Sequence, residues 1–136
     1  MVNKIMIVDD DPDIVLIVKQ GLERIDEDYE VICINSGLAC LEALKNDQIP
    51  DILLLDIMMP GMDGWQLLNR LIDNYEWGKI PIVFLTAKTD SFSKTFGSSV
   101  SIDFIEKPFS IEDLDKRIKN ILNKIKAQKT DHGSMI

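Results

Sequence analysis

The chain has 136 residues, of which 46% are hydrophobic and 28% are charged, and its formal net charge at pH 7 is −8. These values are typical of a single soluble globular domain with a sizeable core. The acidic balance argues against direct nucleic-acid binding, which requires a basic surface, and no apolar run approaches the roughly 18 residues of a transmembrane helix. We therefore expect a cytoplasmic protein without membrane insertion.

The cysteine and histidine contents exclude several kinds of site. Cys33 and Cys40 are too few for a disulfide framework and lack companions for a zinc site, so we interpret them as small core residues in a reducing compartment. The only histidine, His132, lies in a polar stretch that we predict to be a flexible tail over residues 127–136. A catalytic Ser-His-Asp or Cys-His group is therefore close to excluded.

The beginning of the chain predicts a strand followed by a helix. Met1-Val2-Asn3-Lys4 leads directly into a buried strand, Lys4–Val8, rather than into a signal peptide. An aspartate directly before a proline is a helix start, so Asp11 and Pro12 predict a helix beginning there. Apolar residues at helical spacing then form one face of this helix: Ile14, Ile17, Val18, Leu22 and Ile25.

A second strand is predicted at Tyr29–Ile34, and a helix with Leu38, Leu41 and Leu44 on one face follows a short turn. The third strand is the central one. Four consecutive apolar residues, Ile52–Leu55, suit a strand that is covered on both faces, and Asp56 stands where the strand ends.

After Asp56, proline and glycine residues indicate a turn, and Asp63 is placed to cap the next helix. In open parallel sheets, chemistry collects at the carboxyl ends of the strands. Asp56 is therefore a candidate nucleophile, a candidate metal ligand, or both. The alternative from this stretch alone is a second helix cap or a surface acid.

The remaining chain continues the alternation. The third helix is predicted to carry one apolar face and to stop at Gly78; that face consists of Leu67, Leu68, Leu71, Ile72 and Tyr75. The segment Ile80–Leu85 predicts a fourth strand, and residues 89–101 a short, weak helix. The alternating segment Ser101–Glu106 is typical of an edge strand, and Ser110 can cap a final helix.

Five alternations of strand and helix are the pattern of an α/β, doubly wound parallel sheet. We expect one domain over residues 1–126. Right-handed crossovers place helices on both faces of the sheet, so the chain must reverse direction across it. The carboxyl ends of all five parallel strands then lie on one edge.

Five polar side chains fall at that edge: Asp9, Asp10, Asp56, Thr86 and Lys107. The three aspartates would repel one another and need a counter-charge, and oxygen ligands suit a hard cation such as Mg2+. A bound dication together with an ammonium and a hydroxyl matches a phosphoryl group. Each residue alone is better explained as a turn, a strand end or a surface charge, but all of them together at one edge predict phosphoryl chemistry.

The chain resembles the receiver domain of two-component response regulators, the family of the bacterial chemotaxis regulator, across roughly residues 3–126. Four motifs carry the resemblance: Val8-Asp9-Asp10-Asp11-Pro12, Leu55-Asp56-Ile57-Met58-Met59-Pro60-Gly61-Met62-Asp63-Gly64, Leu85-Thr86-Ala87-Lys88 and Phe104-Ile105-Glu106-Lys107-Pro108-Phe109. The family implies a flavodoxin-like fold of five strands, in the order 2-1-3-4-5, and five helices, often with a cis peptide bond at Lys107-Pro108.

The resemblance also implies the parts of a phosphoacceptor site. Asp56 would be the phosphoryl acceptor. Asp10, Asp56 and the backbone carbonyl of Met58 would bind Mg2+, and Asp9 would act through water. Lys107 would be the partner of the phosphate.

Two further residues would form the switch: Thr86 through its hydroxyl, and Phe104 as the aromatic side chain that moves inward when Thr86 shifts. The implied donor is a phosphohistidine on a sensor histidine kinase or phosphotransfer protein, and the output is a contact with a downstream protein target, with a phosphorylation-dependent homodimer as one form. On this interpretation the chain is a phosphoacceptor regulatory domain rather than a conventional enzyme, although it assists its own phosphorylation and dephosphorylation.

Two other functions remain open from the sequence. A magnesium-dependent phosphohydrolase of the haloacid dehalogenase type also uses an aspartate after a strand, but usually carries a second acid two positions later, where this chain has Met58. The second is a receiver that acts as a constitutive docking module with idle chemistry.

Overall fold

The computed structural model describes residues 2–87 and 102–134. Five parallel strands form one sheet in the order β2-β1-β3-β4-β5, which confirms the predicted doubly wound topology. The strands are β1 (Asn3–Val8), β2 (Tyr29–Ile34), β3 (Ile52–Asp56), β4 (Ile82–Thr86) and β5 (Ile102–Glu106). The described helices are α1 (Pro12–Ile25), α2 (Gly37–Lys45), α3 (Gly64–Ile72), the 3-10 helix η1 (Trp77–Lys79) and α5 (Ile111–Ser134).

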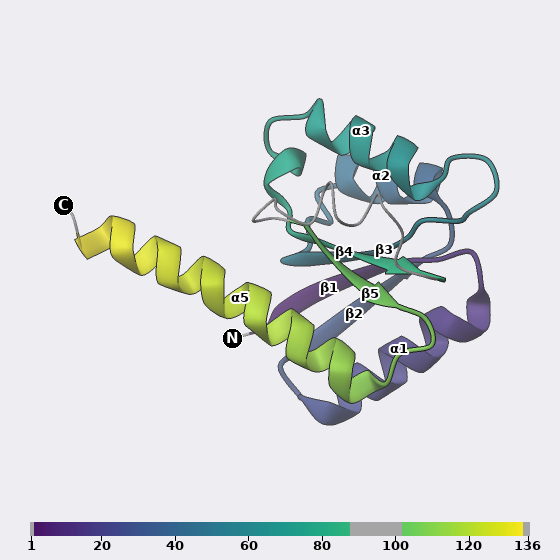
Figure 1. Cartoon of the computed structure of the whole chain (residues 1–136). Coiled ribbons are helices and arrows are strands. Elements are labelled where there is room, and N and C mark those ends of the chain that lie inside the picture. Colours follow the sequence, from purple (N-terminus) through teal and green to yellow (C-terminus); the bar gives the residue numbers. More distant parts are fainter. Residues whose placement is uncertain (1, 88–101, 135–136) are drawn as a thin grey trace.

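The strands supply side chains alternately to two cores, one on each face of the sheet. On one face α2 and α3 pack over residues such as Met6, Leu53 and Phe84, and on the other face α1 and α5 pack over residues such as Ile7 and Leu54 (Figure 1). All five residues of β3 are buried, as expected for the central strand of a parallel sheet. The helices therefore cover both faces and leave the carboxyl edge of the sheet open for a site.

The predicted helix starts are confirmed by their capping hydrogen bonds. The Asp11 carboxylate accepts from the backbone N–H of Asp13 at 2.9 Å, and Pro12 stands at the first helical position. Asp63 and Gln66 form a reciprocal capping box at the start of α3, with both distances 2.9 Å. These caps end the loops that follow β1 and β3, so they hold both loops close to the carboxyl edge.

The third helix is shorter than its apolar pattern predicts. It ends at Ile72, whose side chain is exposed, and Tyr75 is 80% exposed rather than part of the buried face. The Asn74 side chain accepts hydrogen bonds from the backbone N–H groups of Glu76 and Trp77 and so starts a separate turn. Gly78 lies within η1 and does not end α3.

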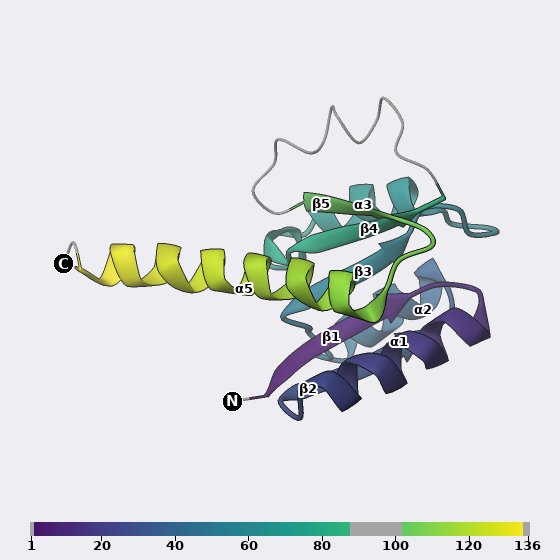
Figure 2. The same ribbon diagram turned by 60° about the horizontal axis from the view of Figure 1, so that its bottom comes forward.

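Three further expectations differ or fall outside the described residues. The predicted weak helix at 89–101 lies in the part of the chain that the structure leaves undescribed, so the expected five helices are represented by four α-helices in residues 2–87 and 102–134. Helix α5 continues to Ser134 and projects beyond the sheet (Figures 1 and 2), whereas the sequence suggested a flexible tail from residue 127. Lysine, alanine and glutamine after residue 125 are good helix formers, which accounts for the continuation.

Side-chain burial also corrects two expectations. Cys40 is buried as predicted, but Cys33 is exposed on the edge strand β2. Ile17 of the predicted α1 stripe is 59% exposed and Ile25 is 40% exposed, because α1 presents only Val18 and Leu22 fully to the core. The surface of α1 therefore keeps apolar residues in contact with solvent.

Candidate functional site

The structure brings the three predicted aspartates together at the carboxyl edge of the sheet. Asp9 follows β1 and Asp56 ends β3, and these strands are direct neighbours in the sheet. One carboxylate oxygen from each of Asp9, Asp10 and Asp56 lies within 4.8 Å of the others. Asp9 and Asp56 are buried, at 1% and 5% exposure, while Asp10 is exposed. The acidic cluster of Asp9, Asp10 and Asp56 is thus open to solvent on the side of Asp10.

Lys107 joins this cluster from the loop after β5. Its Nζ atom lies 3.0 Å from Asp9 Oδ2 and 3.3 Å from Asp56 Oδ1, so one ammonium bridges the two buried carboxylates. The Lys107-Pro108 peptide bond is cis, as the resemblance implied. The backbone N–H of Lys107 donates to the carbonyl of Thr86 at 2.6 Å, which places the ends of β4 and β5 together at the same edge.

Burial and charge compete at this cluster. Burial, together with the neighbouring Asp9 charge, raises the pKa of Asp56 despite the opposing effect of Lys107. Burial acts against the ammonium of Lys107, but the hydrogen bond to Asp9 and the charges of Asp56 and Asp9 outweigh it and raise its pKa. The site therefore holds more negative charge than one lysine fully offsets, which favours the arrival of a further cation.

The donor set fits a small hard dication. The neighbouring ends of β1 and β3 bring carboxylate oxygens of three aspartates within 4.8 Å of one another, and Mg2+ favours a few carboxylate oxygens completed by water and phosphate oxygens. The exposure of Asp10 leaves room for such waters. The residues present are thus suited to Mg2+, and the chemistry of the donors argues against a soft metal.

The loop after β3 is fixed directly to the strand end that carries Asp56. The N–H of Gly64 donates to the carbonyl of Ile57 at 2.9 Å, and the backbone N–H of Met58 donates to Asp56 Oδ1 at 3.4 Å. A Cβ atom on Gly64 would lie 2.7 Å from the backbone oxygen of Asp56, so only glycine allows α3 to begin this close. The Met58 side chain points to solvent and is 76% exposed.

The two predicted switch residues lie on the neighbouring strands β4 and β5, with Phe104 in the middle of β5. Thr86 is the last residue of β4 and is 8% exposed. Phe104 is also 8% exposed and stacks on Phe84, with ring centroids 5.4 Å apart. Trp65 packs against both rings, at 4.7 Å from Phe84 and 6.3 Å from Phe104. The sequence reasoning missed Trp65, although its position in the first turn of the helix after Asp63 was a usable signal.

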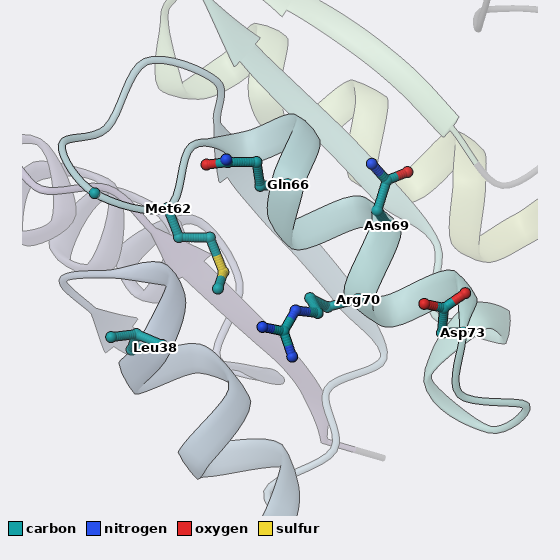
Figure 3. Close-up of a pocket in the computed structure, with 7 residues that line it drawn as sticks. Leu38, Met62, Gln66, Asn69, Arg70 and Asp73 are labelled. Atoms are coloured by element: carbon teal, nitrogen blue, oxygen red, sulfur yellow. The ribbon is translucent and has the colours of Figure 1, made fainter.

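Surface cavities also lie outside the acidic cluster, and two of them adjoin the helices α3 and α1. A groove of about 560 Å³ between α2 and α3 is lined by Leu38, Met62, Gln66, Asn69, Arg70 and Asp73 with Gly61 (Figure 3). It contains none of the predicted site residues. A mainly apolar pocket of about 410 Å³ has Lys107 in its wall. The other residues that line it are Ile14, Ile17, Val18, Ala87, Pro108 and Phe109. This pocket, which we call the α1 pocket, borders the acidic cluster.

Comparison with known proteins shows the family. Residues 5–119 match the family model described as response regulator receiver domain, and the chain therefore belongs to this family. A receiver-domain structure from Methanoculleus marisnigri is 41% identical, with a TM-score of 0.70 over 90% of this chain and 98% of that one. A response regulator receiver protein from Methanospirillum hungatei is 37% identical, with a TM-score of 0.73 over 89% and 98% of the two chains. A chemotaxis protein from Vibrio cholerae is 28% identical, with a TM-score of 0.76 over 89% and 99%.

Receiver domains are regulatory phosphoacceptors of two-component systems that bind Mg2+ at an acidic pocket, and the cluster of Asp9, Asp10 and Asp56 fits that description. Family membership favours signalling over the haloacid dehalogenase alternative. In the described part of the chain, none of the helices combines the length and the apolar composition needed to cross a bilayer.

Proposed function

We propose that this receiver domain is a phosphorylation-activated switch that accepts a phosphoryl group on Asp56 from a phosphohistidine of a sensor histidine kinase or phosphotransfer protein. The observation that supports this most is the bridge from Lys107 to both Asp9 and Asp56 beside a third carboxylate. A lysine shared by two buried acids is unusual for a surface turn, and its position suits the neutralisation of an incoming phosphoryl group.

The transfer would proceed by in-line attack of an Asp56 carboxylate oxygen on phosphorus. The phosphorus–nitrogen bond to the donor histidine breaks, its electron pair stays on the imidazole nitrogen, and an acyl phosphate forms on Asp56. Mg2+, held by Asp10, Asp56 and the Met58 carbonyl with Asp9 acting through water, would neutralise phosphoryl oxygens when bound. Lys107 lies 3.3 Å from Asp56 and could turn from the carboxylate to a phosphoryl oxygen with a small movement.

The switch would act through Thr86 and Phe104. The Thr86 hydroxyl would hydrogen-bond a phosphoryl oxygen, and the packing of Phe104 against Phe84 would report that shift to the surface around β5. Such linkage typically amounts to about 1–3 kcal/mol. The recipient would be a downstream protein target, or a second copy of the chain in a homodimer formed on phosphorylation.

Replacement of the acceptor tests this proposal. Asp56→Asn should abolish labelling by a small-molecule phosphodonor such as acetyl phosphate, read as the gain of one phosphoryl group by intact-mass spectrometry. Removal of Mg2+ with a chelator should do the same to the wild type. Asp73→Asn, which changes an exposed acid at the end of α3, is the matched control and should label normally. Labelling that persists in Asp56→Asn would overturn the acceptor assignment.

The α1 pocket supports a protein as the donor. It places exposed apolar surface, including Ile17 at 59% exposure, beside Lys107, where a kinase domain could dock while its histidine faces Asp56. Ile17→Glu should slow transfer from a phosphorylated donor protein by roughly tenfold or more, as for a buried interface anchor, and leave acetyl phosphate labelling unchanged. Ile72→Glu is an equally exposed control on α3, far in the sequence from the pocket. Equal transfer to both variants would exclude this docking mode.

Two measurements separate the remaining alternatives. A haloacid dehalogenase-like enzyme would release phosphate from phosphate esters with turnover, whereas a switch would not. A constitutive docking module would bind its target without any labelling at Asp56. For the switch we propose a cytoplasmic location, no direct nucleic-acid contact and a phosphorylation-dependent affinity for its target.

A further inference from the structure

The two outer strands of the parallel sheet, β2 and β5, each have one side without a neighbouring strand among the described residues. The backbone groups on that side need other partners. Among the described residues, β2 pairs only with β1 and β5 pairs only with β4. In a parallel sheet, alternate residues of an edge strand direct N–H and C=O away from the neighbouring strand. Such a row of free groups can pair with a strand of another molecule.

On the β2 edge, one ion pair from α1 occupies both backbone groups of a single residue. Lys19 Nζ donates to the carbonyl of Val31 at 2.9 Å, and the N–H of Val31 donates to Glu23 Oε2 at 2.9 Å. Lys19 Nζ also lies 2.9 Å from Glu23 Oε2, and the two residues are four positions apart on α1. The hydrogen bond from the Val31 N–H, and to a lesser extent the one from Lys19, lowers the pKa of Glu23. The Glu23 carboxylate is therefore charged at neutral pH.

On the β5 edge, a second ion pair makes the same pattern on Phe104. The N–H of Phe104 donates to Asp103 Oδ1 at 2.8 Å, and Arg117 Nη1 of α5 donates to the Phe104 carbonyl at 2.9 Å. Arg117 Nη1 also lies 3.0 Å from Asp103 Oδ1. Asp103 belongs to β5 and Arg117 to α5, whereas Lys19 and Glu23 both belong to α1. The two ion pairs are therefore built differently.

We propose that Lys19–Glu23 and Asp103–Arg117 are edge locks, each holding the outward N–H and C=O of one edge residue and thereby preventing the sheet from pairing with a strand of a second copy of this chain. Exposed ion pairs of this kind contribute little to stability on their own. What they add is occupancy of backbone groups, since an incoming strand would have to displace both charged side chains before it could pair. Charged side chains are one of the general means by which sheet edges are protected.

The β2 lock can be tested away from the acidic cluster. Lys19→Met with Glu23→Met retains side-chain length and helix propensity but removes both polar ends. We expect this double variant, without any phosphodonor, to form dimers and larger species as its concentration rises, as measured by size-exclusion chromatography with light scattering. Gln20→Met with Arg24→Met is the matched control on the exposed face of α1 and should keep the oligomeric state of the wild type. If the Lys19→Met, Glu23→Met variant is folded and associates no more than this control, the proposal is wrong.

Amide exchange gives a second test that needs no association. In the lock, the Val31 N–H is protected by Glu23, and loss of a hydrogen bond to a charged group should speed its exchange by roughly tenfold or more in Glu23→Met. Glu23→Gln keeps a carbonyl oxygen at that position and should retain most of the protection. Unchanged exchange of Val31 in Glu23→Met would show that the edge is closed by something else and would also overturn the proposal.

Discussion

Gly64 offers the sharpest test of how the fold positions Asp56. It begins α3 directly against the end of β3, and its N–H donates to the carbonyl of Ile57 at 2.9 Å. An added Cβ would lie 2.7 Å from the Asp56 backbone oxygen and 2.8 Å from the Ile57 Cα atom. Both contacts are with backbone, so no side chain can rotate away. Gly64→Ala must therefore move the helix start or the strand end that carries the acceptor.

The size of the effect follows from these contacts. Overpacking against a rigid neighbour costs about 1–3 kcal/mol, while replacing glycine by alanine in a helix returns up to about 1 kcal/mol. A net loss of about 1–2 kcal/mol should lower the Tm by roughly 3–8 °C for a domain of this size. A shift of a few tenths of an ångström at Asp56 should also slow phosphoryl transfer by roughly tenfold, since misplacement by about 1 Å can cost about a hundredfold.

The assay is thermal unfolding together with the rate of labelling by acetyl phosphate. Gly78→Ala is the matched control, because its added Cβ would meet nothing closer than a carbonyl at 3.5 Å, which is an ordinary contact. The control should be as stable as the wild type and label at the same rate. If Gly64→Ala matches the control in both measurements, the close approach of α3 does not position Asp56 and the reasoning is wrong.

Three further predictions concern single residues. Met58 is exposed and its side chain cannot orient a hydrolytic water by hydrogen bonding, so Met58→Asn should shorten the lifetime of the acyl phosphate; equal decay rates of the two proteins would count against this. Burial and the Asp9 charge raise the pKa of Asp56, so its ionised form costs folding free energy. Asp56→Asn should therefore raise the urea unfolding free energy at neutral pH without Mg2+. This gain should shrink as the pH falls and vanish below the ordinary carboxyl pKa, where wild-type Asp56 is neutral in both the folded and the unfolded state; a gain that grows in acid would refute the sign. Burial raises the pKa of Cys40 to about 12, so a thiol reagent should modify exposed Cys33 first, and Cys33→Ser should remove the fast phase.

Local sequence rules predicted most of the fold. The caps at Asp11 and Asp63 were correct because they depend on residues only two or three positions away. The central strand was correct because Ile52–Leu55 has no polar residue that could face solvent. The α3 stripe failed at Tyr75, where a side-chain turn at Asn74 redirected the chain, and periodicity alone does not register such a competing hydrogen bond.

The site was predicted less completely. The convergence of Asp9, Asp56 and Lys107 follows from a parallel sheet, since each residue lies at the end of a strand or directly after it and all strand ends share one edge. The packing of the Trp65 ring against Phe84 and Phe104 does not follow from spacing, because three separate elements meet there. The hydrogen bonds from the ion pairs to the backbone of Val31 and Phe104 could not be predicted either. The sequence does not show which backbone groups of an outer strand lack a neighbouring strand.

The sequence by itself determined which residues could perform phosphoryl chemistry and in which strand each one stands, because hydrophobic runs, caps and turn residues act over a few positions. Only the tertiary structure decided that one ammonium bridges two buried acids, that Gly64 sets the distance between α3 and Asp56, and how the two sheet edges are closed. Those features depend on distances between segments far apart in the chain. Such distances arise only when the helices pack on both faces of the sheet and fix its strands in register.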